Sequence, residues 1–128
     1  MRGPLAVRGP LAPRGVPVTR SRSQRFDDLV LDAIERIERR YVAELAEVEF
    51  AVEDVPDLDR VDPEPDGIPL GAVMAGRPGQ PTRVVIYRRP IELRTIDDGE
   101  LADFVRDVVV EHVSELLGLP PEEVDPDY

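Results

Sequence analysis

A long apolar pattern near the end of the chain constrains the fold more than any other feature of the sequence. From Asp97 to Gly118, apolar residues recur at three- and four-residue steps, which is the spacing of an α-helix. Asp97 and Glu100 are typical of a capping box at its start, and Gly118 is suited to reverse the chain at its end. Two prolines just beyond the glycine prevent the helix from continuing. The sequence therefore predicts a helix that ends at Leu117 and is covered on most sides.

A second apolar stripe lies closer to the start of the chain and has the same helical spacing. Its members are Phe26, Leu29, Val30, Ala33, Ile34, Ile37 and Tyr41. Ser21 or Ser23 can cap this helix, and acids near its start with arginines near its end suit the helix dipole. We therefore expect a helix that packs on another element and carries no chemistry of its own.

Three further segments have the patterns of strands. Residues 47–55 alternate between apolar and acidic side chains, which predicts a half-buried strand. Pro69 places the strand predicted over 68–73 at a sheet edge or a strand start. Residues 83–88 are apolar on both faces, which is typical of an interior strand. We therefore predict an α+β fold, with two main helices packed on a small mixed or antiparallel sheet of three to four strands.

Charge is distributed unevenly along the chain. The net charge is −11, yet residues 1–25 contain six arginines and no acid, so the remainder is strongly acidic. An acidic body repels phosphates, so nucleic acid could bind only through the basic arm. The absence of cysteine excludes disulfides, cysteine-ligated zinc and thiol nucleophiles. No apolar run approaches the ~18 residues of a membrane span or forms a signal-peptide core, so we expect a cytoplasmic protein without membrane contact.

The boundary of the folded domain is predicted near residue 22. Residues 1–22 are rich in Arg, Pro and Gly and contain Arg-Gly-Pro-Leu-Ala twice, which predicts a disordered arm. An arm that binds RNA or an acidic partner is the alternative, but it has no aromatic side chain for base stacking. Residues 23–128 then form one domain. Within it, the acidic stretch 56–67 lacks the spacing of a calcium loop and is expected to be a solvated linker.

Three side chains that can bind a metal or transfer a proton lie together near the end of the last predicted helix, namely Glu111, His112 and Glu115. At about 100° per residue, His112 falls on the buried face, while the two glutamates lie one turn apart on one side of it. Burying a carboxylate costs on the order of several kcal/mol unless the carboxylate is paired, protonated or bound to a cation. The cluster therefore indicates either a binding site or a structural network. In the network, His112 fills a core position and bonds Glu115 or a backbone carbonyl, while Glu111 faces water.

The order of these segments resembles a known family. A Val-x-Phe-x-Val-Glu-Asp strand, a Gly-Ile-Pro-Leu strand and a Val-Val-Ile-Tyr-Arg strand precede a Val-rich helix that ends in Leu-Gly-Leu. This order is similar to the minimal zincin-like metallopeptidases, short bacterial proteins sometimes labelled "possible zincin". The similarity extends over residues 24 to about 125, and it implies a zincin-like domain over 23–128.

The resemblance also implies a role for the cluster on the last helix. In that family the helix carries HExxHxxG, in which two histidines ligate zinc and the glutamate is the general base. Aligning the motif on Gly118 places Glu111 and Glu115 at the two histidine positions and His112 at the glutamate position. The chain thus has EHxxExxG, and the third-ligand position holds Pro121, which has no ligand atom.

The exchanged motif favours a catalytically degenerate member of the family, a pseudoenzyme without a resident cofactor. Its expected function is to bind a peptide or protein, because an edge strand can hold an extended peptide by strand addition. The residues predicted to form that edge are Ile68, Leu70 and Ala72.

A metal-dependent, peptidase-like hydrolase is the alternative function. Glu111 and Glu115 would then ligate a divalent ion, zinc or manganese, and His112 would act as general base. Carboxylates prefer harder ions than imidazole does, and two oxygens alone bind weakly. Metal binding that depends on both glutamates would therefore separate the enzyme from the binding module.

Overall fold

A computed structural model describes residues 21–57 and 67–128 of the chain. The arm predicted over 1–22 lies outside the described residues, except for Ser21 and Arg22 at the start of the first helix. The acidic stretch 56–67 also lies mostly outside them. In the described part, five helices and three strands form an α+β fold, as predicted. The elements are α1 (Arg22–Glu38), α2 (Val42–Leu45), β1 (Glu49–Glu53), β2 (Gly71–Met74), β3 (Arg83–Tyr87), α3 (Arg88–Glu92), α4 (Asp98–Leu117) and α5 (Pro121–Val124).

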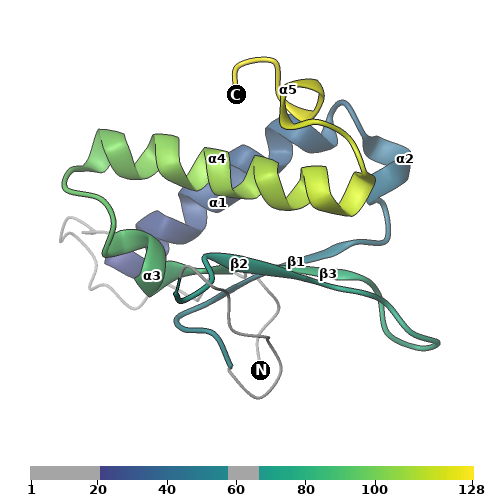
Figure 1. Cartoon of the computed structure of the whole chain (residues 1–128), viewed down its shortest axis with the longest axis horizontal. Coiled ribbons are helices and arrows are strands. Elements are labelled where there is room, and N and C mark those ends of the chain that lie inside the picture. The colour runs from purple at the N-terminus through teal and green to yellow at the C-terminus, as the bar shows by residue number, and fades with distance from the viewer. Residues whose placement is uncertain (1–20, 58–66) are drawn as a thin grey trace, which may run out of the picture.

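The two long helices form one layer and the sheet forms the other. α1 and α4 pack against each other over one face of the sheet, and α5 lies on the side of the helices away from it (Figure 1). The main core lies between the layers and contains Phe26, Val30, Ile34, Ile37, Val84, Ile86, Val105, Val108, Val109 and Val113. Both apolar stripes of the sequence therefore face this core, as predicted. No helix in 21–57 or 67–128 is long and apolar enough to cross a membrane.

The sheet is mixed and has the order β1-β3-β2. β1 pairs with β3 in parallel, with Glu49 opposite Arg83, and β2 pairs with β3 antiparallel, with Gly71 opposite Ile86. β3 is the middle strand because its apolar side chains are buried on both faces of the sheet. This confirms the interior strand that the sequence predicts. β1 and β2 are the two edges of the described sheet.

The edge strand β2 begins later than the sequence predicts. Ile68 is 58% exposed and lies before the strand, which starts at Gly71. Pro69 has no backbone N–H to give to a ladder, so pairing becomes regular only after it. The Leu70 carbonyl accepts a hydrogen bond from the Tyr87 N–H at 3.0 Å, which starts the β2–β3 ladder.

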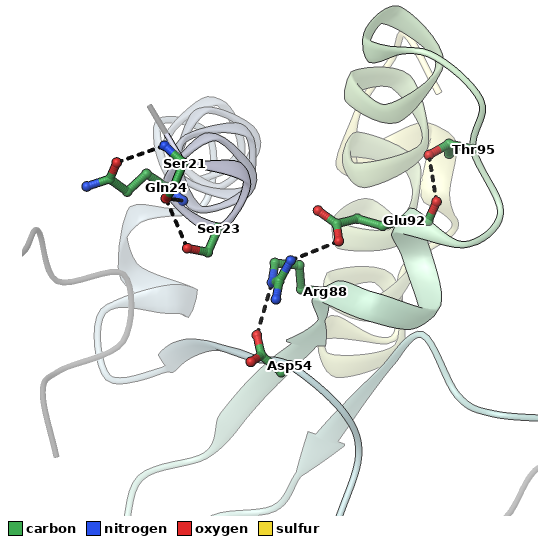
Figure 2. A network of polar contacts seen from close by, with 7 residues as sticks. All are labelled: Ser21, Ser23, Gln24, Asp54, Arg88, Glu92 and Thr95. Atoms are coloured by element: carbon green, nitrogen blue, oxygen red, sulfur yellow. Dashed lines mark hydrogen bonds and ion pairs between the residues drawn. The ribbon is translucent and has the colours of Figure 1, made fainter. Parts of the chain in front are cut away.

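Side chains cap both long helices at the predicted ends. The Ser21 hydroxyl accepts from the Gln24 N–H at 3.2 Å, and the Gln24 side chain accepts from the Ser21 N–H at 3.1 Å (Figure 2). This pair is a complete capping box. At α4 the Asp97 carboxylate accepts from the Glu100 N–H at 2.8 Å, whereas the Glu100 carboxylate accepts from the Ile96 N–H at 3.0 Å. The N-cap bond predicted at α4 is therefore present, but the capping box is not complete, because Glu100 bonds the N–H of Ile96 and not that of Asp97.

Arg88 joins the end of β1 to α3, which leads into α4. Its guanidinium donates to Asp54 at 3.0 Å and to Glu92 at 2.9 Å, and its side chain is only 13% exposed (Figure 2). Because the guanidinium contacts both carboxylates, it fixes the turn from β3 into the helical layer. The start of α4 is thereby held in a defined position over the sheet.

Candidate functional site

The end of α4 is closed by a left-handed glycine, as the sequence predicts. Gly118 has φ +70°, and its N–H donates to the Ser114 carbonyl at 2.9 Å. The Leu119 N–H bonds the same carbonyl at 3.2 Å, and the Ser114 hydroxyl donates to the Leu119 carbonyl. These bonds satisfy groups that a helix end would otherwise leave unpaired. The last turns of α4, which carry the ionisable cluster, are therefore well defined.

His112 is half-buried, and its ring extends from α4 toward β2. Its Nδ1 is 2.7 Å from the Val108 carbonyl, and a carbonyl only accepts, so the Nδ1 carries a proton. In the neutral ring the Nε2 then holds the lone pair. A Cβ placed on Gly71 would lie 2.9 Å from that Nε2. The imidazole therefore occupies space that exists because residue 71 has no side chain.

Glu111 is exposed and is hydrogen-bonded to the end of the chain. The Tyr128 hydroxyl donates to a Glu111 carboxylate oxygen at 2.5 Å. This bond raises the pKa of Tyr128 to about 12, because losing the proton would leave two negative groups in contact. Glu111 thus faces water, as the structural network requires, and it has a specific partner that the sequence did not predict.

Glu115 is exposed and has no hydrogen bond or ion pair with any other residue in the described ranges. Although it lies one turn from Glu111, the Glu111 carboxylate is already bonded to Tyr128. Within residues 21–57 and 67–128, no three His, Asp or Glu side chains are grouped so that they could hold a metal ion. The roles predicted for Glu111, His112 and Glu115 in metal binding and catalysis stay predictions.

The edge of β2 presents backbone groups from two residues. In an antiparallel ladder, backbone groups alternate between pointing at the partner strand and pointing away from it. Since Leu70 bonds Tyr87, the alternation also directs Ala72 toward β3. The N–H and C=O groups of Gly71 and Val73 consequently point away from β3. Neither residue has a backbone hydrogen bond outside the ladder to the described part of the chain.

The three residues predicted for the peptide edge do not share one position. Ile68 precedes β2, while Leu70 and Ala72 direct their backbone groups toward β3. Leu70 packs against the main core, and Ala72 packs on the opposite face of the sheet. Their part in peptide binding stays a prediction, and the outward backbone groups belong to their neighbours.

A cavity of about 670 Å³ adjoins the far end of β2. It is lined by Glu49, Val73, Met74, Ala75, Arg77, Gln80, Pro81 and Arg83. Its lining combines apolar side chains with both signs of charge, and Arg83 is paired with Glu49 at 3.0 Å. Glu49, Arg83 and Met74 are neighbours across the three strands, so the cavity spans the end of the sheet.

The contacts that hold the C-terminal segment were not predicted from the sequence. The Arg36 guanidinium donates to Asp125 at 3.2 Å and to Asp127, and Asp125 is only 2% exposed. The Tyr41 hydroxyl donates to the Glu123 carbonyl at 2.9 Å. These pairs join residues far apart in sequence, and no periodicity or motif connects them. Only the acidity of residues 122–127 opposite an arginine-bearing helix end could have suggested them.

The sequence of the chain also matches a known protein family. A family model described as zincin-like metallopeptidase matches residues 45–128, which is more than half of the chain. The chain belongs to the zincin-like metallopeptidase family. The match includes the sheet, α4 and the C-terminal segment, whereas α1 lies outside it. No curated protein matches the chain significantly.

The zincin-like family implies a zinc ion, and the residues of this member do not fit one. Zinc sites are built from three or more nitrogen, sulfur or carboxylate ligands around one point. Here the two positions on α4 hold carboxylates, one of which is bonded to Tyr128, and Pro121 has no ligand atom. In addition, the nitrogen of His112 that is free to ligate faces Gly71 on β2. No catalytic step through zinc can be derived from this arrangement.

Proposed function

We propose that this zincin-like protein does not carry out zinc-dependent proteolysis and instead binds an extended peptide or protein segment along β2. One observation carries the proposal. β2 is an edge strand whose outward backbone groups, at Gly71 and Val73, lie beside the exchanged motif through the contact of Gly71 with His112. The degenerate motif and a binding edge are thus parts of one surface.

Strand addition suits this edge. An extended peptide that pairs with a sheet edge gains main-chain hydrogen bonds, while pockets for alternate side chains give selectivity. β2 is short, and Gly71 and Val73 supply two N–H and two C=O groups. The cavity lined by Val73 and Met74 adjoins the end of β2 and spans the sheet there. Backbone pairing is therefore available along β2, and a side-chain pocket adjoins the end of the strand.

The residues at the motif positions support the loss of zinc-dependent proteolysis. Carboxylates in place of imidazoles leave a bound zinc less positive, so its water becomes a poorer nucleophile. The position of the general base holds His112 instead of a glutamate, and its Nδ1 proton is held by the Val108 carbonyl. Pro121 removes the third ligand. Each exchange therefore affects a different group that zinc-dependent proteolysis needs: the metal ligands, the general base or the third ligand.

A metal-dependent hydrolase is the second candidate, and one observation favours it. Because the Val108 carbonyl holds the Nδ1 proton, the neutral His112 ring has its Nε2 lone pair available as a base. Glu111 and Glu115 would be the ligands, but Glu111 would first have to release Tyr128. The reaction therefore requires a rearrangement of the C-terminal segment.

Metal binding tests the second candidate directly. The purified full-length protein would be analysed for bound metal, and its thermal unfolding would be followed during titration with zinc or manganese. Glu111→Ala and Glu115→Ala are the test variants, and Glu35→Ala, at an exposed position of α1, is the control. No bound metal and no shift in the parent protein would support the binding module. A shift that both test variants lose and the control keeps would favour the hydrolase.

A proline substitution at the edge tests peptide binding. Val73→Pro removes an N–H that points away from β3, so the ladder keeps its hydrogen bonds. Synthetic extended peptides should bind the parent protein and bind Val73→Pro much more weakly. Ala72→Pro is the matched comparison, because it removes a ladder bond and should destabilise the fold. Equal peptide binding by the parent and a folded Val73→Pro protein would contradict strand addition at β2.

A further inference from the structure

From Asp103 onward, α4 carries an acidic side chain at every fourth position. We name these residues the acidic row, and they are Asp103, Asp107, Glu111 and Glu115. Residues four apart lie one above another on a helix, so the row runs along one side of α4. Burial raises the pKa of Asp107, and the nearby charges of Glu111 and Asp103 raise it further, although Arg106 opposes them. The acids of the row are therefore close enough to repel one another.

The C-terminal end of the acidic row, Glu111 and Glu115, borders the side of α4 that faces β2. His112 marks the direction of β2, because its ring contacts Gly71. At about 100° per residue, Glu115 lies about 60° and Glu111 about 100° to one side of His112. The buried residues Val109 and Val113 lie on its other side. Turning from β2 toward the solvent around α4 therefore leads first to Glu115 and then to Glu111.

Little positive charge neutralises this row. Within the described ranges, the row forms one ion pair, between Asp107 and Arg106, and the distance from Arg106 Nε to Asp107 Oδ1 is a long 4.0 Å. The partner of Glu111 is the neutral Tyr128 hydroxyl, and Glu115 is unpaired there. Glu111 and Glu115 are both exposed, so their charges are accessible from solution. The side of α4 beside the edge of β2 therefore keeps its negative charge.

A peptide paired with β2 would bring a side chain into this field. Directly opposite residues in a ladder direct their side chains to the same face, with Cβ atoms about 5 Å apart. Gly71 and Val73 belong to the face that α4 covers, since Val73 packs against the main core and Gly71 contacts His112. A peptide residue opposite Gly71 would thus extend toward α4. A long side chain there reaches past His112 to the exposed glutamates.

We propose that the occupant of the β2 edge is a basic peptide, with a lysine or arginine opposite Gly71 that pairs with Glu115 and Glu111. This inference rests on the proposed function, because it names the class of peptide that β2 binds. Charge complementarity selects this occupant, since an acidic peptide would be repelled by the row and by the strongly acidic body of the protein. The two carboxylates thereby hold a cationic side chain where other members of the family hold a metal ion.

Matched peptides with one guest residue test the proposal. Synthetic peptides of alternating valine and threonine, with arginine, glutamine or glutamate at the centre, would be titrated with the full-length protein by fluorescence anisotropy. The arginine peptide should bind about fivefold tighter than the glutamine peptide, as expected for an exposed charge pair, and the glutamate peptide more weakly still. The advantage of arginine should shrink as the ionic strength rises from about 0.05 M to about 0.5 M.

Charge-neutral variants connect this preference to the two glutamates. The Glu111→Gln and Glu115→Gln double variant should bind the arginine peptide no more tightly than the glutamine peptide. Glu35→Gln on α1 is the control and should keep the full preference. Both positions on α4 are exposed, so the fold should tolerate the changes, and the melting temperature checks this.

The outcomes separate this inference from the proposed function. Equal binding of the arginine and glutamine peptides, both weakened by Val73→Pro, would overturn the basic preference and leave strand addition at β2 intact. A preference for arginine that persists in the double glutamine variant would also overturn the pairing with Glu111 and Glu115. No binding of any peptide to the parent protein would overturn both proposals.

Discussion

At the scale of single residues, Gly71 and His112 depend on each other. A Cβ at position 71 would lie 2.8 Å from the Val85 carbonyl oxygen and 2.9 Å from the His112 Nε2, and both are closer than a normal contact. The backbone oxygen cannot move without disturbing β3, and the imidazole is held by the Val108 carbonyl. The glycine is therefore required by close packing and not by a special backbone angle.

Gly71→Ala should destabilise the protein by about 1–3 kcal/mol, because an added methyl group in a tightly packed place forces its neighbours apart. Urea denaturation of the parent and the variant measures the difference. Gly99→Ala is the matched control: its Cβ would come no closer than 3.5 Å to another atom, and it lies within α4. That change should stabilise the protein by about 0.5–1 kcal/mol. Combining Gly71→Ala with His112→Ala should cost less than the sum of the two single changes.

Tyr128 should titrate later than an ordinary tyrosine. Its pKa is raised from the usual 10.0 to about 12 by the hydrogen bond to Glu111. Because the folded protein holds this proton more tightly, the bond stabilises the fold fully below pH 10 and is lost as the pH rises towards about 12. Tyrosinate absorbance against pH should contain one late step. Glu111→Gln should move that step to lower pH and Tyr128→Phe should abolish it, and an unmoved step would contradict the bond.

The sequence predicted His112 better than its acidic neighbours. The helical wheel placed His112 on the buried face, because a fixed rotation per residue is enough once the apolar stripe is known. The same wheel left Glu111 exposed but could not supply Tyr128 as its partner. That contact requires the chain to fold back after Gly118, and the position of Tyr128 depends on tertiary packing. Gly71 was likewise unpredictable, because its role depends on a ring from another element.

At the scale of elements, the glycine at the end of α4 has a purely conformational role. Gly118 has φ +70°, and nothing lies within 4 Å of a Cβ built on it. Gly118→Ala should therefore destabilise the protein by about 1–2 kcal/mol, the cost of a left-handed conformation for a residue with a side chain. Gly118→Asn should cost less, because asparagine tolerates that conformation better. Chemical denaturation of the three proteins tests this order, and equal losses for alanine and asparagine would contradict it.

Helix ends were predicted well and strand pairing less completely, for physical reasons. Caps such as Ser21 with Gln24 act over three residues, so the sequence displays both partners together. The start of β2 depends on where the ladder to β3 begins, which involves a residue much further along the chain. The short helices α2, α3 and α5 were not predicted, because four or five residues cannot show a helical period.

At the scale of the whole molecule, the C-terminal segment is fastened to the last turn of α1. Val124 is fully buried, and Arg36 on α1 contacts both Asp125 and Asp127. The Asp125 carboxylate is almost fully buried, so it depends on the guanidinium for compensation. The segment after α4 is therefore an integral part of the core and not a loose tail.

Removing the cation should loosen this segment. Arg36→Gln should lower the melting temperature by a few degrees, because it leaves the buried Asp125 carboxylate without its guanidinium. Arg39→Gln is the control, since Arg39 is exposed and has no ion pair within the described part of the chain. Adding Asp125→Asn to Arg36→Gln should recover part of the loss, because a neutral amide no longer needs a cation. No difference between the two arginine variants would contradict the role of Arg36.

The fold class was predictable from the alternation of patterns, whereas the order of the strands was not. Apolar character on both faces of residues 83–88 correctly placed β3 inside the sheet. Nothing in the sequence indicated that β1 would pair with β3 in parallel while β2 paired with it antiparallel. Pairing partners are chosen by the packing of the helices above, which no single segment encodes.

The pairing of β1 with β3 has a consequence for folding kinetics. β2 and β3 are joined by a short turn and can form a hairpin early, whereas β1 must close a long loop before it meets Arg83 and its neighbours. We therefore expect substitutions in the hairpin to slow refolding, while substitutions in β1 chiefly speed unfolding. Stopped-flow refolding and unfolding rates of Phe50→Leu in β1 and Val73→Ala in β2 measure this difference. The strand that comes first along the chain would then be the last to join the sheet.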